Sequence, residues 1–273
     1  MRKFFYKIHL WLSIPFGLII SIICFSGATL VFEEEITKAL NPHLYNSAPN
    51  GRTEFLSTAE LEQCISKQIS SELTLVSLEI PKNGDDIATA QFKESGKKKL
   101  FINPYTGEIN GWSVKYNFFS TMKKLHRWLI DVPPSKGEKT TGKVIVGIST
   151  IIMVFIIISG IIIWIPRTTY KALKKRLKVS TNKGWRRFMY DSHVAIGIYV
   201  SIFLLVMALT GLTWSFQWYR EIAYSIVDSK SFFYSLHVGN WGGLFTKTIY
   251  FLSAMIGGTL PITGYYLWLK KRL

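Results

Sequence analysis

Four stretches of this chain are apolar and long enough to cross a membrane, and they constrain its fold more than any other feature. Each provides about 20 largely uncharged residues, the length that a helix needs to span roughly 30 Å of hydrocarbon. The four stretches are residues 8–32, 144–165, 194–218 and 248–269. The sequence therefore predicts an all-α membrane bundle of four transmembrane helices.

The bundle consists of two helix pairs that repeat each other. Residues 9–32 recur as residues 193–216, and the second helix of each half repeats as well. The matching residues are His9 and His193, Gly27 and Gly211, Ser159-Gly160 and Thr263-Gly264, Trp164 and Trp268, and the histidines ahead of the second helices, His126 and His237. The repeated glycines can admit either a cofactor face or a neighbouring helix. A duplicated helix pair that keeps a histidine at each matching membrane edge predicts a site between the two copies.

The distribution of lysine and arginine predicts the orientation of the helices. Most of the net charge of +16 falls in residues 1–7, 166–192 and 270–272, which share one side of the membrane if the chain crosses it four times. The positive-inside rule assigns this side to the cytoplasm, so both termini are expected to be cytoplasmic. The basic composition is thus a topology signal. Because no basic stripe is interleaved with aromatic residues, nucleic acid is not expected as a partner.

The segments between the apolar stretches predict how the chain is divided. We expect transmembrane helices in residues 1–32, 143–165 and 193–218, and a fourth helix with its cytoplasmic tail in residues 247–273. The connecting segments are predicted as an extracytoplasmic domain at 33–117, an interfacial helix and loop at 118–142, a cytoplasmic basic loop at 166–192, and an extracytoplasmic loop at 219–246.

The extracytoplasmic domain is predicted to combine one helix with a small antiparallel sheet. Ser57 is an N-cap candidate with Glu60 three residues later, which predicts a helix over residues 57–71. Short strand-like runs follow at residues 74–80, 87–92 and 98–102. The simplest packing is an α+β domain in which the helix covers the sheet.

The residues that close this domain, Asn103-Pro104-Tyr105-Thr106-Gly107-Glu108, resemble those of a PepSY domain. The flanking segments 7–12, 125–128 and 264–268 are similar to the PepSY-associated transmembrane family. This resemblance implies an iron-regulated protein of the bacterial inner membrane, related to haem-containing reductases of ferric siderophores. Because the chain has no fused flavin or nicotinamide domain, we expect the electron donor to be a quinol or a cytoplasmic reductase.

Four of the five histidines occupy repeat-related positions at the predicted helix edges. His9 and His193 are expected at the cytoplasmic edge, and His126 and His237 toward the outer edge. Neutral imidazole is a good axial ligand for haem iron. Together with the resemblance, these positions predict two b-type haems, the inner held by His9 with His193 and the outer by His126 with His237. His43 is expected to face solvent, and no catalytic residue is identified.

These features predict a di-haem electron-transfer protein, an oxidoreductase that reduces ferric siderophore on the periplasmic side and is embedded in membrane lipid. A histidine at a membrane boundary is also commonly a plain interfacial residue. In that case the chain is a membrane-anchored PepSY module that binds or restrains a partner and has no redox activity. A transporter is a third hypothesis, which the scarcity of charged residues in the apolar stretches disfavours. Motifs for hydrolysis or nucleotide binding are absent from the sequence.

Overall fold

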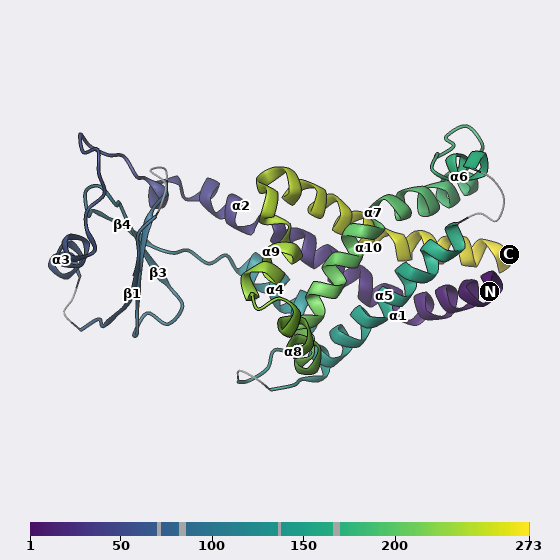
Figure 1. Ribbon diagram of the computed structural model, residues 1–273, viewed down its shortest axis with the longest axis horizontal. Coiled ribbons are helices and arrows are strands. Elements are labelled where there is room, and N and C mark those ends of the chain that lie inside the picture. The colour runs from purple at the N-terminus through teal and green to yellow at the C-terminus, as the bar shows by residue number, and fades with distance from the viewer. Residues whose placement is uncertain (70–71, 82–85, 136–137, 166–169, 273) are drawn as a thin grey trace. The chain divides into compact units, whose positions relative to one another are not determined.

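The computed structural model describes residues 1–273 except 70–71, 82–85, 136–137, 166–169 and 273 (Figure 1). The chain is mostly helical and has one small four-stranded antiparallel sheet. It divides into two compact units. One consists of Met1–Phe32 with Asn117–Leu273 and is called the helical unit here, and the other is Glu33–Tyr116, called the external unit.

The helical unit contains the candidate membrane helices. Three helices are long and apolar enough to cross a membrane within the described part of the chain, namely α1 (Arg2–Val31), α5 (Thr141–Trp164) and α7 (Trp185–Ser215). The chain is therefore a multi-pass membrane protein. The fourth predicted crossing lies in α10 (Gly243–Arg272), which is less apolar than the other three because it carries several glycines and threonines together with Pro261.

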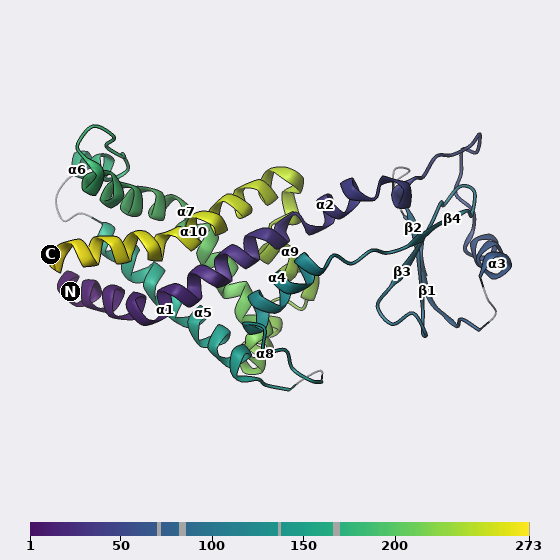
Figure 2. The same cartoon turned by 180° about the vertical axis from the view of Figure 1, so that it is seen from behind.

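The four long helices pack in a closed ring. Helix α1 contacts α5 and α10, and α7 contacts the same two helices from the other side. Two shorter helices repeat this arrangement, since α4 (Asn117–Trp128) packs on α1 and α9 (Lys230–Val238) packs on α7. Figure 2 shows the same helices from behind. The remaining elements of this unit are α6 (Tyr170–Arg176), α8 (Gln217–Ile226) and η2 (Asn240–Gly242).

Residues 219–246 are more ordered than the sequence indicated. We expected a loop there, whereas the structure has most of α8, all of α9 and η2. The Ser229 hydroxyl accepts a hydrogen bond from the Phe232 backbone N–H at 3.2 Å and so caps α9 at its N-terminus. A left-handed Gly239 ends this helix. Because His237 lies in the last turn of α9, these caps position its ring against α7.

A tyrosine links the two halves of the repeat near the inner histidines. The Tyr265 hydroxyl of α10 donates a hydrogen bond to the Ile14 carbonyl of α1 at 2.7 Å and accepts one from the Leu18 backbone N–H at 3.2 Å. Pro15 lies within this turn of α1 and lacks the N–H that a helix normally uses. The hydroxyl therefore supplies polar contacts to the irregular turn and joins α10 to the helix that carries His9.

The external unit confirms the predicted helix and strands and adds a fourth strand. Its elements are α2 (Glu33–Leu40), η1 (Pro42–Tyr45), α3 (Thr58–Gln68), β1 (Leu75–Glu79), β2 (Ala88–Phe92), β3 (Lys99–Ile102) and β4 (Ile109–Trp112), with strand order β1-β2-β3-β4. Ser57 and Glu60 form the expected capping box. The predicted helix end at residues 70–71 lies outside the described residues. Strand β4 was missed because its sequence, Ile-Asn-Gly-Trp, has no alternation of apolar and polar residues.

The turn at residues 103–108 joins β3 to β4. The sequence had indicated that these residues close the domain, whereas the sheet continues beyond them into β4. The Asn103 side-chain oxygen accepts hydrogen bonds from the backbone N–H groups of Tyr105 at 2.9 Å and Thr106 at 3.3 Å. Gly107 has a φ of 73°, a left-handed conformation that favours glycine. These contacts reverse the chain, so that Phe101 and Gly111 pair across the hairpin.

Replacement of Leu61 by alanine is expected to destabilise the external unit by about 2–5 kcal/mol, because the substitution leaves a cavity in a packed core. Leu61 is fully buried between α3 and the sheet, against a core that includes Ile65, Leu100 and Ile102. Denaturant unfolding of residues 33–116 measures the effect. Val76→Ala is the matched control, since Val76 is 63% exposed on β1. Equal stability of the two variants would contradict this description of the core.

Candidate functional site: two histidine pairs

The four repeat-related histidines lie in the helical unit as two pairs. The ring centres of His9 and His193 are 6.3 Å apart, with an angle of 89° between the ring planes. The ring centres of His126 and His237 are 6.1 Å apart, with an angle of 49°. The first pair joins α1 to α7 and the second joins α4 to α9, so each pair takes one ring from each half of the repeat.

His9 and His193, called the inner pair here, are both held through the Nδ1 atoms of their rings. His9 Nδ1 lies 3.0 Å from the Ile156 carbonyl oxygen and 3.2 Å from the Ser159 hydroxyl of α5. His193 Nδ1 lies 2.8 Å from the Thr263 hydroxyl of α10. Each ring is thus anchored to the second long helix of its own repeat.

His126 and His237, called the outer pair here, are anchored in the same way to the first long helix of each repeat. His126 Nδ1 lies 2.8 Å from the Ile23 carbonyl oxygen of α1. His237 Nδ1 lies 3.0 Å from the Met207 carbonyl oxygen and 3.1 Å from the Thr210 hydroxyl of α7. The carbonyls can only accept, so Nδ1 carries the proton in both rings.

The hydroxyls that face the rings also accept a hydrogen bond from Nδ1, because their own hydrogens are already donated to backbone carbonyls. Ser159 and Thr263 donate their own hydrogens to the carbonyls of Ile156 and Leu260, each at 2.9 Å. Thr210 donates to the Val206 carbonyl at 2.7 Å. Nδ1 is therefore the donor, and the lone pair lies on Nε2. Among the residues that the structure describes, no hydrogen bond reaches Nε2 of any of the four rings.

Each ring also lies against a repeated glycine. A Cβ atom added at Gly27 would lie 2.7 Å from Cε1 of the His126 ring, and one at Gly211 would lie 3.1 Å from that of His237. The corresponding distances are 3.2 Å for Gly160 with His9 and 3.5 Å for Gly264 with His193. The glycines thus admit histidine rings, a role that the sequence alone did not distinguish from helix packing.

The glycines and the hydrogen-bond acceptors form a unit that occurs four times. Each consists of a Ser/Thr-Gly step and the carbonyl of the residue three positions before the hydroxyl residue, and we call it an imidazole clamp. The four steps are Ser26-Gly27, Ser159-Gly160, Thr210-Gly211 and Thr263-Gly264. A hydroxyl residue directly before every repeated glycine was the sequence signal that could have revealed the clamps.

A comparison with protein families finds a match over nearly the whole chain. The sequence model described as PepSY-associated TM region matches residues 6–230 and 228–271. The chain belongs to this family. A comparison with curated proteins finds no match. The matched residues of this PepSY-associated TM protein include both halves of the repeat and all four histidines of the two pairs.

The outer pair of this PepSY-associated TM protein is half-buried, and its histidines have lowered pKa values. Burial lowers the pKa of His126, and burial together with the charge on the partner ring lowers the pKa of His237 to about 4. The Arg127 guanidinium adds a smaller effect in the same direction at both rings. Trp214 packs beside His237, with ring centres 5.2 Å apart.

The donor sets fit haem better than a bare metal ion. In the described part of the chain, no group of three or more His, Cys, Asp or Glu residues could hold a metal ion. Haem needs only axial ligands, because the porphyrin supplies the others. Imidazole nitrogen binds first-row metals at about 2 Å, so two rings on opposite sides of one iron have centres about 6 Å apart. The separations of 6.3 Å and 6.1 Å agree with this requirement.

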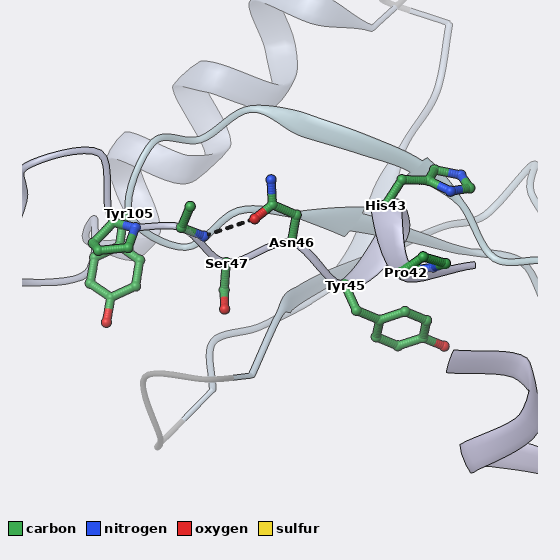
Figure 3. A pocket seen from close by; sticks show the side chains of 8 residues that line it. Pro42, His43, Tyr45, Asn46, Ser47 and Tyr105 are labelled. Carbon is green, nitrogen blue, oxygen red and sulfur yellow. Dashed lines mark hydrogen bonds between the residues drawn. The ribbon is translucent and has the colours of Figure 1, made fainter. Parts of the chain in front are cut away.

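The fifth histidine lies away from both pairs, in the external unit. His43 is exposed, as the sequence predicted, and lines an open pocket of about 730 Å³. Figure 3 shows this pocket with Tyr45 and Tyr105 at its two ends. Its lining combines polar residues such as Asn46 and Ser47 with Pro42, Ala48 and Pro49, and includes no Asp, Glu, Lys or Arg.

Proposed function

We propose that this PepSY-associated TM protein is a di-haem electron-transfer protein that reduces ferric siderophore on the periplasmic side of the bacterial inner membrane. The proposal is carried by the two imidazole pairs, in which every Nδ1 is bound and every Nε2 lone pair is left for a metal. Haem held between the rings of each pair supplies one-electron transfer. His9 and His193 would hold the inner haem, and His126 and His237 would hold the outer haem.

The four imidazole clamps prepare the histidine rings to hold haem. They fix the tautomer and orientation of each imidazole, which is the usual role of groups bound to the second nitrogen of a metal-binding histidine. A haem held by either pair would link two rings from different repeats, and each ring is anchored to a further helix. Haem binding would therefore stabilise the whole ring of α1, α5, α7 and α10.

We further propose that α10 is the fourth crossing. Its 30 residues correspond to about 45 Å of helix, more than the hydrocarbon thickness. Four crossings and the positive-inside rule give cytoplasmic termini, with the inner pair toward the cytoplasm. Membrane lipid covers the exposed apolar side chains of the bundle, such as Leu18, Phe155 and Ile202. A quinol or a cytoplasmic reductase supplies the electrons, and ferric siderophore accepts them.

Anaerobic mixing of the reduced full-length protein with a ferric hydroxamate chelate tests the activity. We expect the haem absorbance to return to its oxidised form while a ferrous-specific chelator traps the product. Each ferric ion takes one electron, so a fully reduced chain is expected to yield two ferrous ions. Reoxidation at the same rate without the ferric chelate would exclude it as the acceptor.

A membrane-anchored binding module without redox activity is the second candidate function. The observation that favours it is the open pocket beside His43 and Tyr105 in the external unit, whose volume is within the usual range for small-molecule sites. In this case His9, His193, His126 and His237 are structural. Purified protein that stays colourless after expression with ample haem would favour this candidate.

A further inference from the structure

Two arginines converge on the C-terminal end of α5 in the helical unit. Arg2 of α1 donates a hydrogen bond from Nη2 to the Ile163 carbonyl. Arg176 of α6 donates from Nη1 to the same carbonyl at 3.4 Å and to the Trp164 carbonyl. The last carbonyls of a helix attract cations, which accounts for the position of both guanidiniums. Segments that are far apart in sequence thus bring two positive charges together.

Arg2 and Arg176 are more buried than the other cations of the three basic segments of the sequence. Both are half-buried, whereas every other lysine and arginine whose side chain the structure describes in these segments is exposed. The acidic residue of these segments, Asp191, is paired with Arg187 at 2.9 Å. In the described part of the chain, neither Arg2 nor Arg176 forms an ion pair. The two guanidiniums are therefore partly withdrawn from water, and no described carboxylate neutralises them.

The same end of α5 has further hydrogen-bond donors. The bonds to α5 use one nitrogen of each guanidinium, so most of its five N–H groups remain for another partner. The indole Nε1 of Trp164 is buried and has no hydrogen-bond partner among the residues that the structure describes. An unpaired buried donor costs free energy, which a bound acceptor recovers. Two positive charges beside an unpaired donor are the chemistry that binds an anion.

These donors lie beside the inner histidine pair. A Cβ atom at Gly160 of α5 would lie 3.2 Å from the His9 ring, and Ile163 follows Gly160 by three residues, which correspond to about 4.5 Å of helix. Trp164 follows Gly160 by four residues and therefore lies on the same face of α5. Arg2 precedes His9 by seven residues, so these two share a face of α1. The donors thus lie between the inner pair and the ends of the two helices.

Resting on the proposed function, we propose that Arg2, Arg176 and Trp164 form an anion site that binds the propionate carboxylates of the inner haem. The propionates lie on one edge of the porphyrin, and a guanidinium pairs with a carboxylate through parallel N–H···O bonds. The site therefore turns this edge toward the N-terminus of α1 and the C-terminus of α5. It also selects porphyrins with free carboxylates, a choice that the axial histidines alone do not make.

Absorbance titration of the haem-free full-length protein with haem and with its dimethyl ester tests this site. The His126→Ala background confines the measurement to the inner pair. Arg2→Gln and Arg176→Gln should each weaken the binding of haem by roughly tenfold or more, as expected for loss of a hydrogen bond to a charged group. Trp164→Phe removes the N–H and should also weaken it. Lys175→Gln, which changes an exposed neighbour of Arg176, is the matched control and should leave the dissociation constant unchanged.

The ester separates binding of the propionates from a purely structural role of the arginines. Esterification removes both carboxylate charges, so it should weaken binding to the His126→Ala chain by at least as much as one arginine substitution. In the chain that also carries Arg2→Gln and Arg176→Gln, haem and its ester should bind equally, because groups that interact directly are not additive. A structural role would instead weaken the binding of haem and of the ester by the same factor.

The outcomes separate this inference from the function on which it rests. An ester that binds the His126→Ala chain as tightly as haem would overturn the anion site, even if the arginine variants do not fold. Equal weakening of haem and ester by the arginine substitutions would overturn it as well. Arginine variants that keep their affinity for haem and lose affinity for phosphatidylglycerol would assign the site to a lipid phosphate, against the proposal. These results leave the di-haem function intact, whereas a chain that binds neither haem nor its ester removes both.

Discussion

Protein with alanine at His9 is expected to retain one haem per chain instead of two, and protein with alanine at His126 is expected to retain the other. Under the proposed function each substitution removes one of the two rings that would hold a haem, and the remaining ring alone should hold it poorly. The two pairs use different rings and different clamps, so loss of one haem should leave the other in place. Haem content per chain and the reduced-minus-oxidised spectrum measure both effects. His43→Ala is the control and should keep both haems, because His43 lies in the external unit.

The pairing itself is tested by combining substitutions. His9→Ala and His193→Ala should remove the same absorbance, and the double variant should lose no more than either single variant, because residues that act as one unit are not additive. The same relation is expected for His126 with His237. Loss of both haems in His9→Ala with His193→Ala, or additive loss within a pair, would show that the rings do not share a metal.

Gly27→Ala is expected to abolish the outer haem, whereas Gly264→Ala is expected to leave the inner haem bound. A Cβ at Gly27 would lie 2.7 Å from the His126 ring, closer than side-chain contacts allow, so the ring would have to move and lose its hydrogen bond to Ile23. At Gly264 the corresponding distance to His193 is 3.5 Å, an ordinary van der Waals contact.

The two glycine variants are a matched pair, because each adds one methyl group to a long helix at a clamp. Haem content reports the site, and thermal unfolding of the haem-free protein reports helix packing. Equal haem loss in both variants, or haem loss that only follows a general loss of stability, would contradict the clamp. Gly160 and Gly211, with distances of 3.2 Å and 3.1 Å, are expected to show intermediate effects.

The sequence predicted the elements whose pattern is local. Apolar stretches of sufficient length revealed α1, α5 and α7, and the capping box at Ser57 and Glu60 revealed the start of α3. Strand β4 was not predictable in this way, since Ile109–Trp112 is a strand through its pairing with β3 and not through its own propensities. Helix α9 was missed because its nine residues carry polar and aromatic side chains without a clear helical stripe.

The candidate site was predictable only in part for a similar reason. The repeat identified which histidines correspond, because an internal duplication is visible in one chain. The clamps depend on which helix lies beside each ring, and this follows from packing between segments far apart in sequence. His9, for example, contacts Ile156 and Ser159 on α5. The Ser26 hydroxyl donates to the Ile22 and Ile23 carbonyls and, unlike the other three clamp hydroxyls, makes no hydrogen bond to its ring, a difference that no sequence pattern specifies.

The absorbance spectrum of the purified wild-type protein, combined with its haem content per chain, tests the central claim most directly. Two rings on one iron give low-spin haem, so we expect a sharp alpha band in the reduced-minus-oxidised difference spectrum and about two haems per chain. A colourless protein after expression with ample haem, or a spectrum typical of a single axial ligand, would contradict the account.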